Sequence, residues 1–327
     1  MPKSGNQMLR VGPIAAPPGE RAEGYAELGE WPNRQPWHIP IAIVNGAQYG
    51  PVAYVQAVSD GDELNGIAVL QRILRRLRPE RLRGALIAVP LTNIPAFLAR
   101  RSENPVDGKK LNRCFPGRAQ GTSSERIAYF LFREAVQQAD FVIDLHQGGT
   151  GKMIDECRVR VNQGDRAGPA SFELGRVFGS GFILHQRGPD GQLARAAPAQ
   201  GIPAIDPELG GACGWDESSI RKGVRGVLNV FRHFGMIEGQ PRPPKRQVVC
   251  RALRPVLCRH GGLRALRKPL GALMKRGEVF AEILDPFGGV VEEIRSPAHA
   301  VLWAYDPHPG VASGQRVATL GLRPTFI

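Results

Sequence analysis

Three short polar segments follow apolar runs that are predicted to be buried strands. They are SDGDELNG at 59–66, DLHQGG at 144–149 and PELGG at 207–211. Open α/β sheets bind their ligands at the carboxyl ends of strands, so these segments are candidates for one shared site. Their carboxylates and imidazole are groups that hold metal ions and move protons.

Asp60 and Glu63 lie three residues apart at a predicted turn from strand to helix, so both carboxylates can face one point. His146 ends another predicted strand. Together they form a candidate set of metal ligands with an open fourth position, as in catalytic zinc sites. Such an ion would polarise a carbonyl group and lower the pKa of a bound water toward about 7. Glu208, flanked by apolar residues and glycines, is the candidate that accepts and returns a proton.

Each of these residues also has an ordinary structural interpretation. An acidic residue at a helix start, such as Asp60 or Asp62, is more often an N-terminal cap than a ligand. A histidine at a strand end, such as His146, is usually a hydrogen-bonded surface or core group. The metal site is therefore inferred from the three segments together.

The first elements indicate an α/β domain. Apolar, β-branched runs at 39–46 and 51–58, separated by only four residues, are predicted to be neighbouring buried strands. Helical spacing of apolar residues follows from 64 and stops near Pro79.

The following elements continue this pattern. Strands are predicted at 85–91 and 139–146, and helices at 123–136, with Ser123 as the N-cap, and at 219–237. Residues 92–117 show no periodic apolar pattern and are predicted to be a long functional loop. The alternation is typical of a largely parallel sheet between helices.

Residues 239–247 are rich in proline and charge, and we place a domain boundary there. Residues 39–238 are then a predicted α/β/α domain with a mixed, largely parallel sheet. Residues 1–38 are an N-terminal segment expected to pack partly on it. Residues 248–327 alternate short apolar runs with Gly and Pro turns, so they are predicted to form a small all-β domain.

Composition limits the classes of function. Of 327 residues, 42% are hydrophobic and 22% are charged, and no run approaches the roughly 20 apolar residues of a membrane helix. The N-terminal residues contain no apolar core of a secretory signal, so a cytoplasmic location is expected. The five cysteines are widely spaced without a CxxC pair, which argues against disulfides and against a cysteine zinc cluster.

The net charge of +13 raises the alternative of a nucleic-acid-binding protein, with the arginine-rich run at 72–84 as its best support. In that run Ile73, Leu74 and Leu77 fall as on one side of a helix, so the arginines are predicted to form its solvated side. No aromatic residues are interleaved for stacking on bases. We therefore expect no nucleic-acid partner, and the charge can instead attract an anionic substrate.

The segments DGDELNG, LNRCFPG, DLHQGG and ELGG occur here in order, and through them the chain resembles the succinylglutamate desuccinylase and aspartoacylase family from about 39 to 327. The resemblance implies a zinc-carboxypeptidase-like α/β/α domain and a C-terminal β domain that narrows the active-site mouth. It also implies one zinc ion per chain. The implied reaction is cleavage of an N-acyl amide of a small amino-acid-like substrate that carries a carboxylate.

The resemblance implies a role for each matching residue. Glu63 and His146 would be zinc ligands, and Glu208 the general base and acid. Asn112 and Arg113 would clamp the substrate carboxylate, which the planar fork of arginine matches. In the same loop Arg101 would stabilise the oxyanion, with its neighbour Arg100 as the alternative or as a substrate contact.

Asp60 departs from the family pattern, which has a histidine ligand at this position. Aspartate still ligates zinc, but its negative charge weakens the Lewis acidity of the metal and raises the pKa of its water. The harder ligand set makes manganese or another divalent ion an alternative to zinc. A second hypothesis is a catalytically altered or inactive relative that binds a small amino-acid-like ligand. The oligomeric state is left open, with a homo-oligomer as one option.

Overall fold

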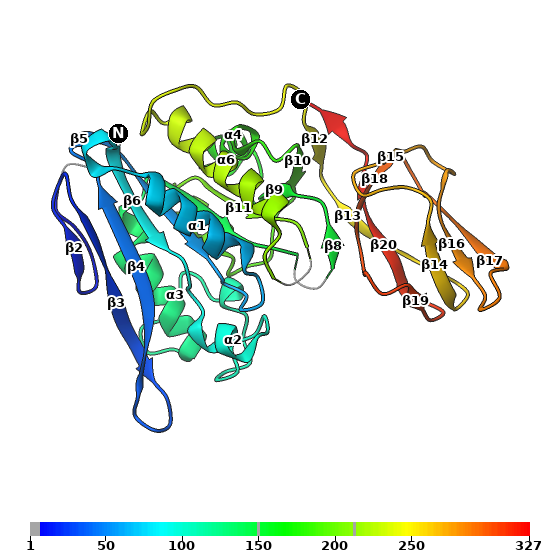
Figure 1. Ribbon diagram of the computed structural model, residues 1–327, viewed down its shortest axis with the longest axis horizontal. Coiled ribbons are helices and arrows are strands. Elements are labelled where there is room, and N and C mark those ends of the chain that lie inside the picture. Colours follow the sequence, from blue (N-terminus) through cyan, green and yellow to red (C-terminus); the bar gives the residue numbers. More distant parts are fainter. Residues whose placement is uncertain (1–6, 149–150, 212–213) are drawn as a thin grey trace.

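The structure, a computed structural model, describes residues 7–148, 151–211 and 214–327 (Figure 1). A ten-stranded mixed sheet forms the larger part of the chain. Its strands lie in the order β21 (Thr325–Phe326), β12 (Val248–Cys250), β10 (Phe182–His185), β9 (Glu156–Val159), β11 (Ala204–Glu208), β7 (Phe141–Leu145), β5 (Gln48–Ala57), β6 (Arg83–Val89), β4 (Pro36–Asn45) and β3 (Arg21–Glu30). The pairs β12-β10, β10-β9, β11-β7, β7-β5 and β5-β6 are parallel, which confirms the predicted sheet.

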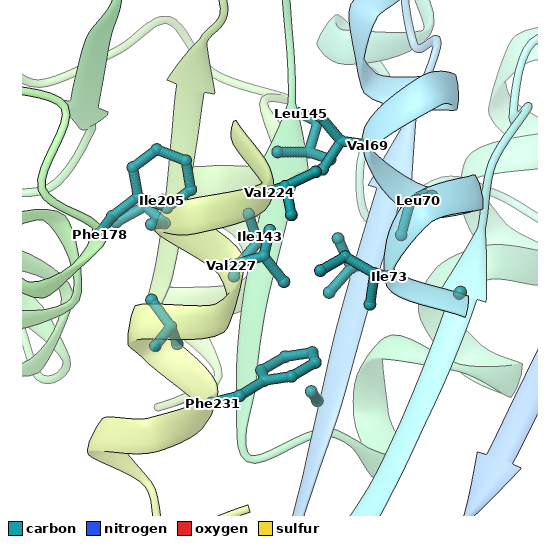
Figure 2. Packing of buried hydrophobic residues seen from close by; sticks show 14 of the residues in the cluster. Val69, Leu70, Ile73, Ile143, Leu145, Phe178, Ile205, Val224, Val227 and Phe231 are labelled. Carbon is teal, nitrogen blue, oxygen red and sulfur yellow. The ribbon is translucent and has the colours of Figure 1, made fainter. Parts of the chain in front are cut away.

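Helices cover both faces of this sheet, so the α/β part has the predicted three layers. One face carries α1 (Asn65–Arg76), α4 (Gly168–Phe178) and α6 (Glu217–His233), and the other carries α3 (Ser123–Glu134), α5 (Leu193–Ala199) and the hairpin of β1 (Leu9–Val11) and β2 (Ile14–Ala16). Because successive side chains of a strand point to opposite sides, Val55 of β5 packs in the first layer and Tyr54 in the second. In Figure 2, Val227 of α6 and Ile73 of α1 lie on either side of Ile143 of β7.

The strands predicted at 39–46 and 51–58 are present as β4 and β5, but they are not neighbours. β6 lies between them, antiparallel to β4 and parallel to β5. The two-residue link Gly46–Ala47 passes the start of β6, where the Gly46 N–H donates to the Gly84 carbonyl at 2.8 Å. A Cβ atom on Gly46 would lie 2.2 Å from the Leu82 carbonyl oxygen, so glycine allows this close crossing.

The predicted helices at 64–79, 123–136 and 219–237 are present as α1, α3 and α6. Two local predictions are wrong. The N-cap of α3 is Thr122, not Ser123, because Thr122 and Glu125 form a capping box. The predicted irregular loop contains the short helix α2 (Ile94–Ala99), whose start is capped by the side chain of Asn93.

The C-terminal part consists of two smaller antiparallel sheets, as its alternating pattern predicts (Figure 1). One sheet has the order β13 (Leu253–Leu257), β20 (Arg316–Leu322), β18 (Ala300–Tyr305) and β15 (Leu273–Met274). The other has the order β17 (Val290–Arg295), β16 (Val279–Leu284), β14 (Gly262–Leu266) and β19 (Gly310–Val311). Phe280, Leu302 and Leu320 belong to a separate apolar core of this part.

Strands cross between the two parts of the chain. β8 (Lys152–Met153), from the α/β part, pairs with β18, whereas β12 and β21 extend the large sheet beside β10. Ile154 and Leu184 pack with Val301 and Trp303 in a cluster at this junction. The expected boundaries of the N-terminal segment, the α/β domain, the linker and the β domain stay predictions, and the large sheet also includes β3 and β12 from outside 39–238.

The arginine-rich helix α1 has the predicted division into a buried and a solvated side. Ile73 and Leu74 of α1 are buried whereas Arg75 and Arg76 are exposed, which is the predicted solvated basic side. None of the described helices is long and apolar enough to cross a membrane. The four cysteines within the described ranges are free, and Cys213 lies outside them.

Glu125 generates a prediction about acid stability. The Thr122 N–H donates to it at 2.9 Å, and this bond together with Lys109 and Arg118 lowers the pKa of Glu125 to about 2. A lowered folded-state pKa stabilises the fold above the ordinary carboxyl pKa, and this stabilisation is lost as the pH falls toward 2. We expect Glu125→Gln to lower the Tm at pH 7 and to flatten its decline between about pH 5 and 2. Thermal melts followed by circular dichroism measure both, with the exposed Glu134→Gln as the control on the same helix. Equal behaviour of the two variants would contradict the capping role.

Candidate active site

A sharp turn links the end of β5 to the start of α1. Val58 has a φ of +63°, a left-handed conformation that is costly for a β-branched residue. The Val58 carbonyl accepts hydrogen bonds from the Thr92 hydroxyl at 2.8 Å and from the Asn93 N–H at 3.1 Å, which hold the turn in this conformation. The turn carries Asp60 and Glu63 past the carboxyl end of β5.

The N-terminus of α1 is capped by Gln147, which lies on a different segment. Its Oε1 accepts from the backbone N–H groups of the two residues at the helix start, at 2.9 and 3.0 Å. Asp62 instead accepts from a serine hydroxyl of the following loop at 3.0 Å. The interpretation of Asp60 or Asp62 as a helix cap is therefore wrong. The carboxylates of Asp60 and Glu63 face the cavity described below.

The sheet brings the three polar segments together. His146 follows β7 and forms a parallel bridge with Glu208 of the neighbouring β11. On the other side of β7 lies β5, whose end leads to Asp60. Because three adjacent strands end at the same edge, their polar residues meet there, as the sequence predicts.

Asp60, Glu63 and His146 form a cluster whose ligand atoms lie within 4.8 Å of one another. Glu63 Oε2 is 2.8 Å from His146 Nδ1 and accepts from the Gln147 N–H at 3.0 Å. Asp60 Oδ1 is buried and accepts no hydrogen bond from the described residues. A buried carboxylate oxygen without a donor is costly, and two carboxylates with an imidazole are a ligand set for zinc. The residues therefore fit a divalent metal ion.

The electrostatics of the cluster favour the protonated forms of its groups. Burial raises the pKa of Glu63 to about 8 and raises the pKa of Asp60. Burial opposes a charged His146 ring, but the carboxylates of Asp144 and Glu63 outweigh it and raise the pKa of His146. Metal ligands bind in their deprotonated forms, so a metal ion that binds here must displace protons from the cluster.

Asp144 supports His146 from within the sheet. It is fully buried, with Oδ2 3.1 Å from His146 Nε2 and Oδ1 accepting from Gln56 Nε2 at 2.9 Å. Gln56 accepts in turn from the Tyr54 hydroxyl at 2.7 Å. Asp144 therefore lies beside the ring nitrogen opposite Nδ1, which is the position that carboxylate partners of metal-binding histidines usually take. Sequence reasoning missed Asp144, although a residue two before His146 shares its side of the strand.

Glu208 is buried beside the cluster, but not in the apolar surroundings that its sequence neighbours predict. Arg158 Nη1 lies 2.6 Å from Glu208 Oε1, and Arg158 Nε also donates to Glu156 at 2.8 Å. The reason is the antiparallel pairing of β9 with β11, which places Glu156 opposite Glu208. Arg160 pairs with Asp206 at 2.8 Å in the same way. The alternation of Glu156, Arg158 and Arg160 is a sequence signal for one charged strand side, and sequence reasoning missed it.

The cluster and Glu208 line one cavity of about 460 Å³. Lys110, which precedes the 3-10 turn η2 (Leu111–Arg113), lines it from the α/β part. Trp303, Tyr305 and Arg316 line it from the C-terminal sheets. The C-terminal part therefore forms some of the cavity wall, as the resemblance implies.

The two residues expected to clamp a carboxylate are both at this cavity but differ in surroundings. Arg113 is exposed and lines the cavity. Asn112 is buried, with Nδ2 3.0 Å from His146 Nε2 and Oδ1 accepting from the Leu193 N–H at 3.1 Å. The Asn112 side chain therefore also contacts a member of the metal cluster.

Arg100 and Arg101 lie outside the cavity lining. Both are exposed, and Arg100 ends α2 in a left-handed conformation with a φ of +53°. The Arg101 carbonyl accepts from the Gly61 N–H at 3.1 Å, so its backbone supports the turn that carries Asp60. The oxyanion role of these two arginines stays a prediction. The structure brings the other expected site residues together at one cavity: Asp60, Glu63, Asn112, Arg113, His146 and Glu208.

The fold and the site are those of a hydrolase of the carboxypeptidase-like type with a candidate metal centre. The sequence profile of the Succinylglutamate desuccinylase/Aspartoacylase catalytic domain matches residues 49–234. An N-alpha-acetyl-L-2,4-diaminobutyric acid deacetylase from Halomonas elongata is 31% identical over 291 residues, which cover 86% of this chain and 85% of that protein. This chain belongs to the succinylglutamate desuccinylase and aspartoacylase family of zinc-type amide hydrolases.

Solved structures share the whole fold. The succinylglutamate desuccinylase/aspartoacylase from Rhodobacter sphaeroides has a TM-score of 0.80 at 27% identity, covering 93% of this chain and 96% of that one. A succinylglutamate desuccinylase from Silicibacter sp. TM1040 has a TM-score of 0.82 at 25% identity, covering 96% and 99%. Because both are covered almost completely, the C-terminal sheets belong to the shared fold.

Asp144 generates a prediction about metal affinity. Removing a partner that orients a metal-binding histidine usually costs 10- to 100-fold in affinity. We expect Asp144→Asn to weaken zinc binding by about that factor, measured by competition with a chromogenic chelator. Asp140→Asn, on the same strand segment but outside the cavity lining, is the matched control. Equal zinc affinity of Asp144→Asn and the wild type would exclude the supporting role.

Proposed function

We propose that this enzyme removes an N-acyl group from a small amino-acid-like amide in the cavity formed by Asp60, Glu63, His146 and Glu208. The observation that carries the proposal is the buried three-ligand cluster beside a glutamate in one cavity. A cavity of about 460 Å³ suits a small molecule. The proposed metal is zinc, with manganese as the alternative because two of the three ligands are carboxylates.

A zinc ion held by Asp60, Glu63 and His146 supplies Lewis acidity toward a carbonyl group and lowers the pKa of water. Glu208 is proposed to accept a proton from the water that attacks the amide carbon. As the carbon–nitrogen bond breaks, Glu208 returns that proton to the departing amine. Arg158 contacts Oε1 of Glu208, so Oε2 is the oxygen proposed to exchange the proton.

The substrate is proposed to carry a carboxylate that Arg113 binds at the cavity wall, with Asn112 beside it. The planar guanidinium can donate two parallel hydrogen bonds to a carboxylate. The Halomonas relative is a deacetylase of an N-acetylated diamino acid, which makes N-acetyl amino acids the first substrates to test here. N-succinyl amino acids are the second class.

A binding protein without turnover is the second candidate function. Asp60 is the observation that favours it, because an extra carboxylate ligand weakens the Lewis acidity of a metal. The remaining residues of the expected set, with Glu208 in the cavity wall, favour the hydrolase.

Replacing Glu208 tests the proton-transfer role. Loss of a general base usually costs 10²- to 10⁴-fold in rate, so we expect Glu208→Gln to lower kcat by about that factor. The variant should keep its metal because Glu208 is not among the three ligands. Steady-state hydrolysis of an N-acetyl amino acid and elemental analysis measure the two quantities. The exposed Glu238→Gln is the control, and a Glu208→Gln variant with more than about a tenth of the wild-type kcat would refute the role.

Metal removal separates the two candidate functions. We expect dialysis against a chelator to abolish hydrolysis, and zinc or manganese to restore it, because the ligand cluster lies beside Glu208. Activity is measured on N-acetyl and N-succinyl amino acids in parallel. Metal-depleted protein that stays inert after either ion is added would favour the binding protein.

A further inference from the structure

Lys110 contacts the one ligand that departs from the family pattern. Its Nζ lies 3.7 Å from Asp60 Oδ2 and 3.9 Å from Glu103 Oε1. The Lys110 side chain lines the active-site cavity and is 37% exposed, whereas that of Asp60 is 13% exposed. Lys110 provides the one lysine or arginine nitrogen within 4.0 Å of Asp60 among the described residues.

We propose that Lys110 balances the negative charge of Asp60 at the metal centre. The ammonium group lies beside Oδ2, whereas Oδ1 is buried and has no hydrogen-bond donor among the described residues. Oδ1 is therefore the oxygen that is available to a metal ion. This inference rests on the metal centre proposed above.

The charges of the ligands explain why a positive charge at Lys110 matters. Two carboxylate ligands cancel the charge of a divalent ion, whereas one carboxylate with two neutral imidazoles leaves one positive charge. Lys110 restores one positive charge next to Asp60 and so offsets the loss of Lewis acidity that an aspartate causes. Glu208 has its own cationic partner, Arg158 at 2.6 Å, which it shares with Glu156 at 2.8 Å.

Metal affinity and turnover should respond in opposite directions when this charge is removed. An ammonium group close to a ligand repels a metal ion, so its removal tightens metal binding. The same removal leaves the bound ion with less effective positive charge and slows hydrolysis. Loss of a merely structural contact would weaken both.

The experiment compares zinc dissociation constants of the full chain by chelator competition. We expect Lys110→Met to bind zinc about tenfold more tightly than the wild type and to hydrolyse an N-acetyl amino acid more slowly. Lys110→Arg, which keeps the charge, should keep the wild-type zinc affinity. Lys109→Met is the matched control, because Lys109 pairs with Glu125 at 3.0 Å and does not line the cavity. Thermal melts establish that each variant is folded.

Asp60→Asn tests whether Lys110 acts through Asp60. In that background, Lys110→Met should no longer tighten zinc binding. The inference is overturned if Lys110→Met binds zinc no more tightly than the wild type, or if it tightens binding equally with Asp60→Asn. In either case a wild type that binds zinc leaves the proposed function intact. A wild type that binds neither zinc nor manganese would refute both.

Discussion

The contact between Glu63 and His146 is the interaction on which the active site depends. Both side chains are buried, and the 2.8 Å between Oε2 and Nδ1 can form only if β5 and β7 are adjacent and the turn after β5 is sharp. Gln147 stabilises this contact in two ways: its side chain caps α1, and its backbone N–H donates to Glu63. The strained Val58 turn persists because this packing over-determines it.

Hydrophobic patterning and the strand-end rule were sufficient to predict the central strands β4, β5, β6 and β7, the helices α1, α3 and α6, and the meeting of Asp60, Glu63, His146 and Glu208. Each of these follows from local periodicity and from one general property of parallel sheets. The position of β6 between β4 and β5 was not predictable in this way, because it depends on how Gly46 passes Leu82. The capping of α1 by Gln147 was not predictable from local patterns either, because Gln147 and the start of the helix are more than 80 residues apart in the sequence.

The surroundings of Glu208 could not be predicted from neighbouring residues either, because they depend on the antiparallel pairing of two strands. Its sequence neighbours are apolar, but the pairing of β9 with β11 supplies Arg158 from a segment 50 positions earlier. Buried ion pairs of this kind contribute little net stability, and breaking one by removing a single partner is strongly destabilising. Arg158 and Arg160 are each paired with a carboxylate, so they place fixed charges in the cavity wall. Apolar residues at these positions would pack more easily but would provide no charge.

The pairing of β8 with β18 has a consequence for how the protein is made. Residues 152–153 leave the ribosome about 150 positions before their partners at 304–305, an interval of roughly 8 to 30 s at ordinary elongation rates. During that interval the metal ligands are all synthesised, but Ile154 and Leu184 lack Val301 and Trp303 to cover them. The nascent chain thus carries the candidate metal ligands beside apolar surface that is not yet covered, and this is the stage at which chaperones have time to bind.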